Sequence, residues 1–86
     1  MNRLIILKYM DKLTKEDINK YASGQDISLK SNELDLIYAY IKKYSKRILN
    51  DPLDVIDEIK DDLSIDVYNK LLELYDKYKD FIDKLK

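Results

Sequence analysis

The sequence predicts an all-α fold, which we expect to be a small orthogonal bundle of about five short helices with one extended connecting segment at about residues 25–30. The chain has one Gly and one Pro in 86 residues, whereas a β-sheet protein of this size normally needs several glycine-containing turns. Apolar residues recur at the spacing of amphipathic helices along most of the chain. A chain this short has room for a single core, so residues 1–86 are expected to form one helical domain.

Two helices are predicted before residue 25. The first covers residues 3–12, although periodicity alone also allows a short strand over residues 4–7. The second begins after Thr14, a good N-cap, because Asp17 stands at the acidic position of a capping box. It ends at Gly24, which adopts the left-handed C′ conformation without steric cost. The residues expected to point inward are Leu4, Ile6, Leu7 and Met10 in the first helix and Ile18, Tyr21 and Ala22 in the second.

The middle of the chain is predicted to be an extended segment followed by a central helix. Ile27 and Leu29 lie two residues apart, so on an extended backbone both point to the same side and can enter the core. The central helix then begins at Ser28 or Ser31 and ends near residues 47–48. Its apolar surface is nearly twice as wide as the roughly 100° arc of an ordinary surface helix, as expected for a helix covered from two sides. Its apolar residues are Leu34, Leu36, Ile37, Tyr38, Tyr40, Ile41, Tyr44 and Ile48.

Two capping signals define the last two helices. Asp51 before Pro52 places a capping carboxylate at the N-cap and the missing N–H at the first helical position, where no partner is lost. The helix that follows is expected over residues 52–62. Ser64 caps the last helix, at about residues 65–85. The residues expected to face the core are Leu53, Ile56, Ile59 and Leu63 in the first of these helices and Val67, Tyr68, Leu71, Leu74, Tyr75, Tyr78, Ile82 and Leu85 in the second.

The composition argues against most catalytic and metal chemistry. The chain has no Cys, and therefore no disulfide, thiolate metal site or cysteine nucleophile. It also lacks His, the commonest general base and metal ligand. We therefore expect no enzymatic activity and no cofactor. No apolar run approaches the roughly 20 residues of a membrane span, so we expect a cytoplasmic protein without membrane contact.

The acidic side chains of the helix predicted over residues 52–62 have two interpretations. Carboxylates one turn apart can bind Mg²⁺ or Ca²⁺, but one face of one helix supplies only one side of the oxygen cage that these ions require. We therefore expect no metal site, and interpret this face as solvated or as a docking surface for a basic partner. The side chains are Asp54, Asp57, Glu58, Asp61 and Asp62.

The end of the central helix is strongly basic. Such a cluster could contact phosphates, with a nearby tyrosine for base stacking, so a small nucleic-acid-binding protein is the alternative function. Neutralisation is favoured instead, because residues 1–50 carry ten basic and six acidic groups whereas residues 51–66 carry one and seven. A nucleic-acid-binding protein usually shows an unopposed basic surface. The cluster consists of Lys42, Lys43, Lys46 and Arg47.

We expect the chain to act as a non-enzymatic protein-interaction module. Tyrosine is enriched at protein interfaces, so Leu36, Tyr40 and Tyr44 are a docking patch if exposed; the shortness of the chain favours their coverage by the terminal helices. The expected partner is a protein, and a homodimer is one form, since basic and acidic sections on one molecule are self-complementary under two-fold pairing. The predicted interaction surface consists of Leu36, Tyr40, Lys43, Tyr44, Lys46, Arg47, Asp54, Asp57, Glu58 and Asp61.

Four segments between residues 13 and 80 carry a resemblance to a known family. They are Leu13-Thr14-Lys15-Glu16-Asp17, Tyr21-Ala22 to Ile27-Ser28-Leu29, Tyr40-Ile41, and Ile48-Leu49-Asn50-Asp51 before the acidic helix. In this order they resemble the YqfT-type family, a domain-of-unknown-function family of short proteins from Gram-positive bacteria. One departure is Lys30, where the family pattern tends to have a capping hydroxyl. The resemblance implies a small helical cytosolic protein with no established activity, so no functional residue is carried over.

A second and looser resemblance covers the same part of the chain. A capped short helix, an extended loop with buried apolar residues and a following helix are similar to the helix, extended loop and helix of SAP-type nucleic-acid-binding modules. Here the second helix is longer, and three further elements surround it.

Overall fold

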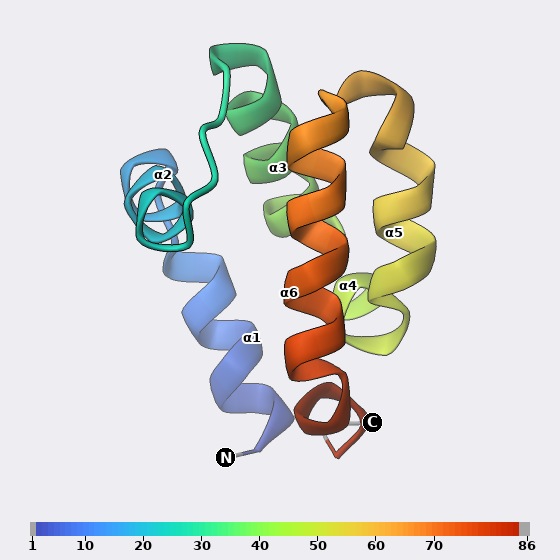
Figure 1. Cartoon of the computed structure of the whole chain (residues 1–86). Coiled ribbons are helices and arrows are strands. Elements are labelled where there is room, and N and C mark those ends of the chain that lie inside the picture. Colours follow the sequence, from blue (N-terminus) through green and yellow to red (C-terminus); the bar gives the residue numbers. More distant parts are fainter. Residues whose placement is uncertain (1, 85–86) are drawn as a thin grey trace.

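The computed structural model describes residues 2–84, and within this range it contains helices and no strand, which confirms the predicted all-α class (Figure 1). Residues 3–12 are helical, so the alternative strand is wrong. The predicted end of the last helix at Leu85 lies outside the described residues. No helix of the described range is long and apolar enough to cross a membrane. The elements are α1 (Arg3–Lys12), α2 (Lys15–Gly24), α3 (Ser31–Lys43), α4 (Ser45–Asn50), α5 (Pro52–Ile59), the 3₁₀ turn η1 (Lys60–Asp62) and α6 (Ile65–Asp83).

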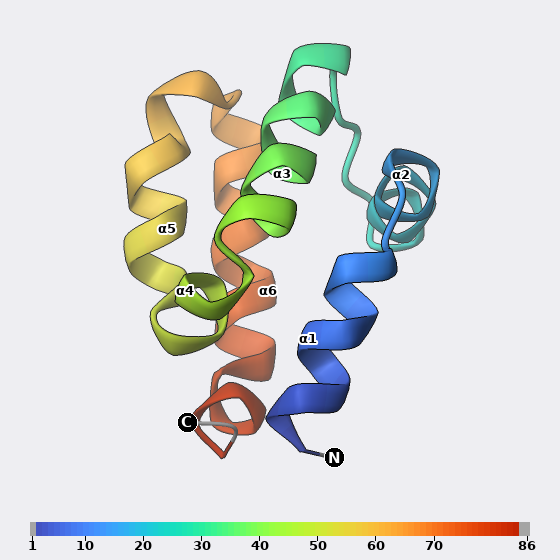
Figure 2. The same cartoon turned by 180° about the vertical axis from the view of Figure 1, so that it is seen from behind.

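Helix α3 lies at the centre of the bundle. It packs against α1, α2 and α4, while α6 packs against α5 and α4. Figure 1 shows α2 end-on, so α2 runs roughly across the direction of α1 and α6, as predicted for an orthogonal bundle. From behind, α3 stands between α2 and α5, with α4 below it (Figure 2). The bundle therefore has α1 and α2 on one side of α3, and α5 and α6 on the other.

Local capping signals set most helix starts, as predicted. The backbone N–H of Thr14 donates to the Asp17 carboxylate at 3.0 Å, and the N–H of Asp17 donates to the Thr14 hydroxyl at 3.1 Å. These two bonds complete the predicted capping box. Asp51 and Ser64 cap α5 and α6 by accepting from the N–H three residues further on. Three of the predicted starts are therefore confirmed by their hydrogen bonds.

The end of α2 differs from the prediction. Gly24 does not adopt a left-handed conformation, and the residue with positive φ is Asp26, at 60°. The N–H of Asp26 donates to the Ser23 carbonyl at 3.2 Å and that of Ile27 to the Ala22 carbonyl at 2.8 Å. These are the two bonds of a Schellman motif with Asp26 at C′. The motif sits two residues later than predicted because Ile27 and Ala22 pack together in the core.

The predicted central helix is in fact two helices. Between α3 and α4, Tyr44 has φ −124° and ψ 33°, which lies outside the helical range. The break turns α4 so that Leu49, which the apolar pattern does not single out, packs against Met10 of α1. The prediction of one continuous helix to residues 47–48 is therefore wrong, because a tertiary contact outweighs the local pattern.

Two small clusters of buried side chains form most of the core. One joins α1 to α3 and α4, and the other joins α2 and the extended segment to α6. Ile27 and Leu29 enter the second cluster, as predicted. The first cluster is Met10 and Leu49 with Ile6, Leu7, Ile41 and Ile48 packed against them, and the second is Ala22, Ile27 and Val67 with Leu29, Leu63, Leu71 and Leu74.

Some predicted inward side chains lie at the surface. In α5, Val55 is buried in place of Leu53, because Val55 and Ile59 stand one turn apart and together turn toward the core. The α-helix then ends at Ile59, and the predicted last turn to residue 62 is the 3₁₀ turn η1. On α2 and α6 the outer apolar side chains are only partly covered. The exposed residues are Leu4 (66%), Tyr21 (53%), Leu53 (42%) and Tyr78 (39%).

Candidate interaction site

The predicted basic cluster and the acidic helix meet within the molecule. Arg47 Nη2 donates to Asp54 Oδ2 and Nη1 to Glu58 Oε2, each at 2.7 Å. The hydrogen bond with Asp54, followed by that with Glu58, raises the pKa of Arg47 above its ordinary value. Arg47 is on α4 and both carboxylates are on α5, two helices that pack against each other. These charges are therefore paired inside the molecule.

Two tyrosines of the predicted surface lie beside this ion pair. The ring centroids of Tyr40 and Tyr44 are 5.1 Å apart, and the Arg47 guanidinium carbon is 5.9 Å from the centroid of Tyr44. Burial, followed by the negative charge of Glu58, raises the pKa of Tyr40. Both tyrosines are half-buried, so the predicted aromatic patch is partly covered.

The lysines of the basic cluster have separate surroundings. Lys42 Nζ donates to two backbone carbonyls at the end of α1, where a cation is favoured by the helix dipole. Lys43 Nζ lies 5.3 Å from the ring centroid of Tyr44, and Lys46 is exposed. Of the four cations, Lys43 and Lys46 are therefore the ones best placed to meet an external anion.

The largest apolar concavity is a groove that the sequence pattern does not predict. Residues of α2, α3 and α6 line both of its parts; α4 and α5 contribute to one part, and α1 contributes Tyr9 to the other. It consists of two adjoining cavities of about 280 and 340 Å³, and Tyr21, Leu71 and Leu74 line both. The smaller cavity extends toward α5 and the larger toward α2. We refer to the two together as the apolar groove.

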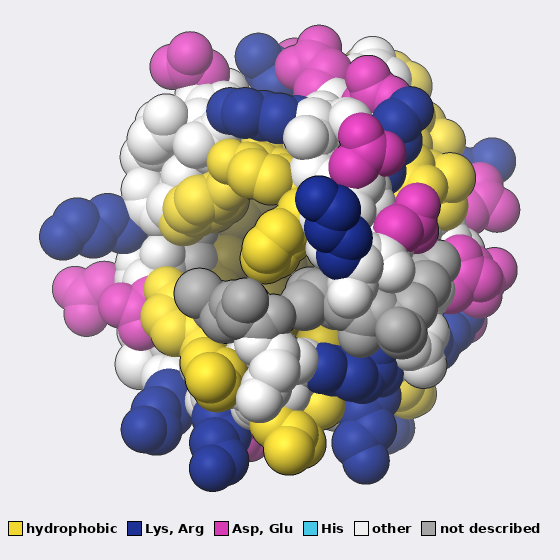
Figure 3. All heavy atoms as spheres, turned by 90° about the horizontal axis from the view of Figure 1, so that it is seen from below, with side chains coloured by type: hydrophobic (Ala, Val, Ile, Leu, Met, Phe, Trp, Pro, Cys, Tyr) yellow, Lys and Arg dark blue, Asp and Glu magenta, His cyan; other side chains and the backbone are white. Residues whose placement is uncertain are grey.

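One end of the molecule has a hollow among hydrophobic side chains. Seen from the end where α1 begins, the molecule is hollowed, and hydrophobic side chains line the hollow (Figure 3). The chain exposes 5979 Å², about a tenth more than the roughly 5,400 Å² typical of a compact monomer of this mass. The large apolar side chains that are exposed include Ile5, Tyr9, Tyr21, Ile65 and Phe81.

Tyrosines stand at the mouth of the apolar groove. Tyr21 of α2 and Tyr78 of α6 both line the smaller cavity, and burial, followed by the neighbouring Tyr78 hydroxyl, raises the pKa of Tyr21. Tyr9 of α1 lines the larger cavity and is 65% exposed. The mouth therefore offers aromatic surface with polar hydroxyl ends, a combination enriched at protein interfaces.

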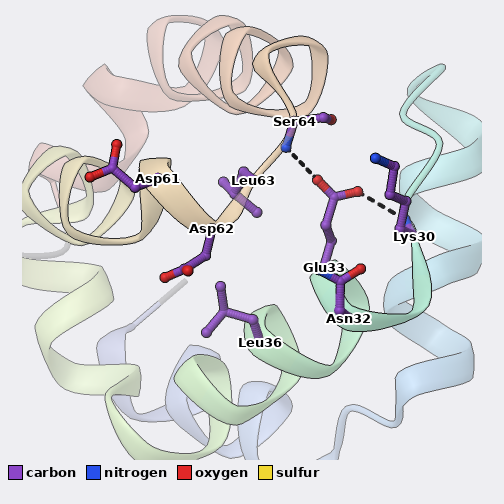
Figure 4. A pocket seen from close by; sticks show the side chains of 8 residues that line it. All are labelled: Lys30, Asn32, Glu33, Leu36, Asp61, Asp62, Leu63 and Ser64. Carbon is purple, nitrogen blue, oxygen red and sulfur yellow. Dashed lines mark hydrogen bonds between the residues drawn. The ribbon is translucent and has the colours of Figure 1, made fainter.

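Two residues of the predicted surface lie elsewhere, in a polar cleft of about 650 Å³ at the other end of α3 (Figure 4). Leu36 and Asp61 line this cleft beside Glu33, whose side chain is almost fully buried. Glu33 Oε1 accepts from the N–H of Lys30 at 2.9 Å and Oε2 from the N–H of Ser64 at 2.7 Å. Because both oxygens are bonded to the backbone, Glu33 has a structural role.

The predicted interaction surface is therefore divided. Asp57, for example, forms an ion pair at 3.5 Å with Lys60, three residues further along the chain. The described residues contain no group of three or more carboxylates that could hold a metal ion. The structure brings together Tyr40, Lys43, Tyr44, Arg47, Asp54 and Glu58, with Lys46 nearby, and leaves Leu36, Asp57 and Asp61 apart.

A sequence signal for the apolar groove exists but is weak. Tyr9 was not assigned to the core and Tyr21 was, and both line the larger cavity and are exposed. Helical periodicity identifies which side of α6 is apolar, and does not tell whether another helix covers that side.

Comparison with protein-family models, curated proteins and solved structures finds no match to this chain.

Proposed function

We propose that the chain is a non-enzymatic protein-interaction module whose binding site is the apolar groove. The observation that carries this proposal is a pair of adjoining apolar cavities, both lined by residues of α2, α3 and α6, with tyrosines among the lining residues. Open apolar concavities with a few polar groups are the usual binding sites of small domains, and contiguous exposed apolar surface commonly marks an interaction site. The absence of Cys is compatible with a reducing cytosol, where we propose that the protein acts.

The charged surface around Arg47 supports binding less well. Its guanidinium is paired with Asp54 and Glu58, and Lys42 is bonded to the end of α1. A nucleic-acid-binding function would rest mainly on Lys43 and Lys46. Few basic contacts give weak phosphate binding, because affinity rises with the number of phosphates neutralised.

The test is capture of protein partners from the native cytosol by the immobilised chain, with and without nuclease. The variant Tyr21→Ser with Tyr78→Ser removes aromatic surface at the mouth without adding charge. Buried interface tyrosines typically contribute about 1–2 kcal/mol each, so we expect its captured partners to be lost or strongly reduced. The matched control is Leu53→Ser with Ile65→Ser, because both side chains are exposed and neither lines the groove.

We expect wild type and control to retain the same partners, with nuclease having no effect. Equal capture by the tyrosine variant would show that the apolar groove is not the site. Capture that nuclease abolishes, and that Lys43→Glu with Lys46→Glu also abolishes, would instead support the nucleic-acid-binding alternative.

A further inference from the structure

We propose that Tyr44 is a hinge at which two copies of the chain exchange halves, so that residues 1–43 of each copy pack against residues 45–84 of the other. This inference does not depend on the proposed function. Three features of the molecule support it: the lack of a local signal that ends the helix at Tyr44, the backbone hydrogen bonds that the break leaves unmade, and the division of both core clusters between the two halves.

The local sequence does not explain the break at Tyr44. Helices commonly end at a glycine and begin at a side chain that accepts a hydrogen bond from the backbone. Residues 31–50 contain neither Gly nor Pro. Tyr44 is the residue that follows α3 and also the one that precedes α4, and its side chain makes no capping bond to α4. The local sequence therefore favours one continuous helix.

Helical hydrogen bonds reach the break from both sides. The N–H of Tyr44 donates to the Tyr40 carbonyl at 2.8 Å, and the N–H of Ile48 donates to the Tyr44 carbonyl at 2.9 Å. No helical turn spans Tyr44, so the three i to i−4 bonds that the N–H groups of residues 45, 46 and 47 would donate across it are not made. A continuous helix makes all three.

The bend is held by contacts between the two halves of the chain. Leu49 packs against Met10, and Arg3 Nη2 donates to the Lys46 carbonyl at 3.4 Å. The second core cluster likewise joins Ile27 in the first half to Val67 in the second. Because each cluster draws on both halves, a chain that straightens at Tyr44 exposes both of them, and an open monomer is unstable.

A second copy of the chain restores these contacts. When α3 and α4 form one helix, Met10 of one copy packs against Leu49 of the other copy, and the second cluster is rebuilt in the same way. The ion pairs of Arg47 with Asp54 and Glu58 lie within the second half and are kept. The exchanged dimer therefore retains the contacts of the monomer and adds the three hydrogen bonds at each hinge.

Concentration decides between the two forms. Association costs translational and rotational freedom, so a chain that folds at low concentration closes on itself and is a monomer. Exchange of halves requires both copies to unfold, because both core clusters must open. Salt therefore has little effect on it.

The test is refolding of the full chain from urea at about 10 μM and at about 1 mM, since mass action favours the dimer at the higher concentration. Size-exclusion chromatography with light scattering then measures the mass. We expect the 10.3 kDa monomer from dilute refolding and a dimer of twice this mass from concentrated refolding. The dimer should persist after dilution and at high salt, because its separation is limited by unfolding.

Two substitutions at the hinge form a matched pair. Tyr44→Ala and Tyr44→Gly both remove the ring that lies beside Tyr40 and Arg47, so they lose the same contacts. Alanine favours the helix over glycine by about fivefold at each hinge, and the dimer has two hinges. We therefore expect the dimerisation constant of Tyr44→Ala to be about 20-fold larger than that of Tyr44→Gly. Circular dichroism checks that both variants fold.

Contacts between copies distinguish exchange from association through an exposed surface. A dimer refolded from equal amounts of isotope-labelled and unlabelled chain should show, in isotope-filtered NMR spectra, Met10 of one copy close to Leu49 of the other. A dimer without this contact between copies would overturn the exchange.

Two further results would also contradict the proposal. One is a monomer from every concentrated refolding, for Tyr44→Ala as well as for the wild type. The other is equal dimerisation of Tyr44→Ala and Tyr44→Gly, which would show that continuity of the helix does not drive the exchange. Partner capture tests the proposed function separately, and none of these results bears on it.

Discussion

Among single residues, Glu33 joins the starts of two helices that are distant in the sequence. Its carboxylate accepts one hydrogen bond at the start of α3 and one from Ser64 at the start of α6. Burial raises the pKa of Glu33, but the hydrogen bonds donated by Ser64 and Lys30 favour the ionised form and leave its pKa below the ordinary value. A carboxylate with a lowered folded-state pKa stabilises the protein above its unfolded pKa, and this stabilisation is lost as pH falls through the folded pKa.

Replacing this carboxylate should therefore cost stability in a pH-dependent way. Glu33→Gln turns an amide NH₂ toward one of the two backbone N–H groups, and a buried donor without an acceptor costs about 1–3 kcal/mol. We expect that loss at neutral pH. The difference between wild type and variant should shrink below about pH 4.3, the ordinary glutamate pKa. Urea unfolding followed by circular dichroism, at neutral pH and near pH 3, measures both effects.

Asp35→Asn is the matched control for this variant. Asp35 is on the same helix, its side chain is 58% exposed, and it pairs with Lys15 at 2.9 Å. Exposed pairs contribute less than about 1 kcal/mol, so the free energy of unfolding should change little. A Glu33→Gln effect of constant size at every pH would contradict the assigned role of the ionised carboxylate.

At the scale of elements, the last residue of α2 and the left-handed residue after it are two different positions. The prediction placed both roles at Gly24. Gly24 is inside the helix, and a Cβ added there meets nothing within 4 Å. The left-handed position belongs to Asp26, a residue type that tolerates this conformation better than most. A small residue is therefore not required at Gly24.

Gly24→Ala should stabilise the protein by about 0.4–1 kcal/mol, because alanine reduces the entropy of the unfolded chain and favours the helix. Asp26→Ala should destabilise it by about 1 kcal/mol, since alanine lacks the short polar side chain with which aspartate can hydrogen-bond locally at positive φ. Thermal unfolding resolves both, as 1 kcal/mol shifts Tm by about 4–8 °C in a domain of this size. A lower Tm for Gly24→Ala would contradict the placement of the Schellman motif.

Some features of the elements depend only on neighbouring residues, and others depend on distant contacts. The starts at Thr14, Asp51 and Ser64 are predictable because a capping side chain and its N–H donor lie three residues apart. The break at Tyr44 is not predictable in this way. It depends on Leu49 reaching Met10, a contact between residues that are distant in the sequence, and no local pattern contains it.

For the whole molecule, contacts between distant residues also explain why the apolar groove could not be predicted from the sequence. Tyr21 of α2 and Tyr78 of α6 were predicted to point inward, yet both are exposed because no further helix of the described residues covers them. Predicting the apolar groove requires the distance between two helices that are separated by most of the chain. The charged surface around Arg47 was easier to anticipate, because α4 and α5 are adjacent in the sequence.

The pairing of Arg47 also changes the expectation for self-association. A homodimer held by basic and acidic sections needs those sections to be available, and Arg47 is already bonded to Asp54 and Glu58 within one chain. We therefore expect a monomer of 10.3 kDa at low and at high salt. Size-exclusion chromatography with light scattering checks this, and a dimer that dissociates as salt screens charge would contradict it.

The bonds of Glu33 have a further consequence for how the molecule can move. By joining the N–H groups of residues 30 and 64, this carboxylate closes α3, α4, α5 and η1 into a frame. The segments outside the frame are α1–α2 and α6, and both join it beside Glu33. Removing the carboxylate should therefore loosen the link between the starts of α3 and α6 without breaking a backbone hydrogen bond inside any helix.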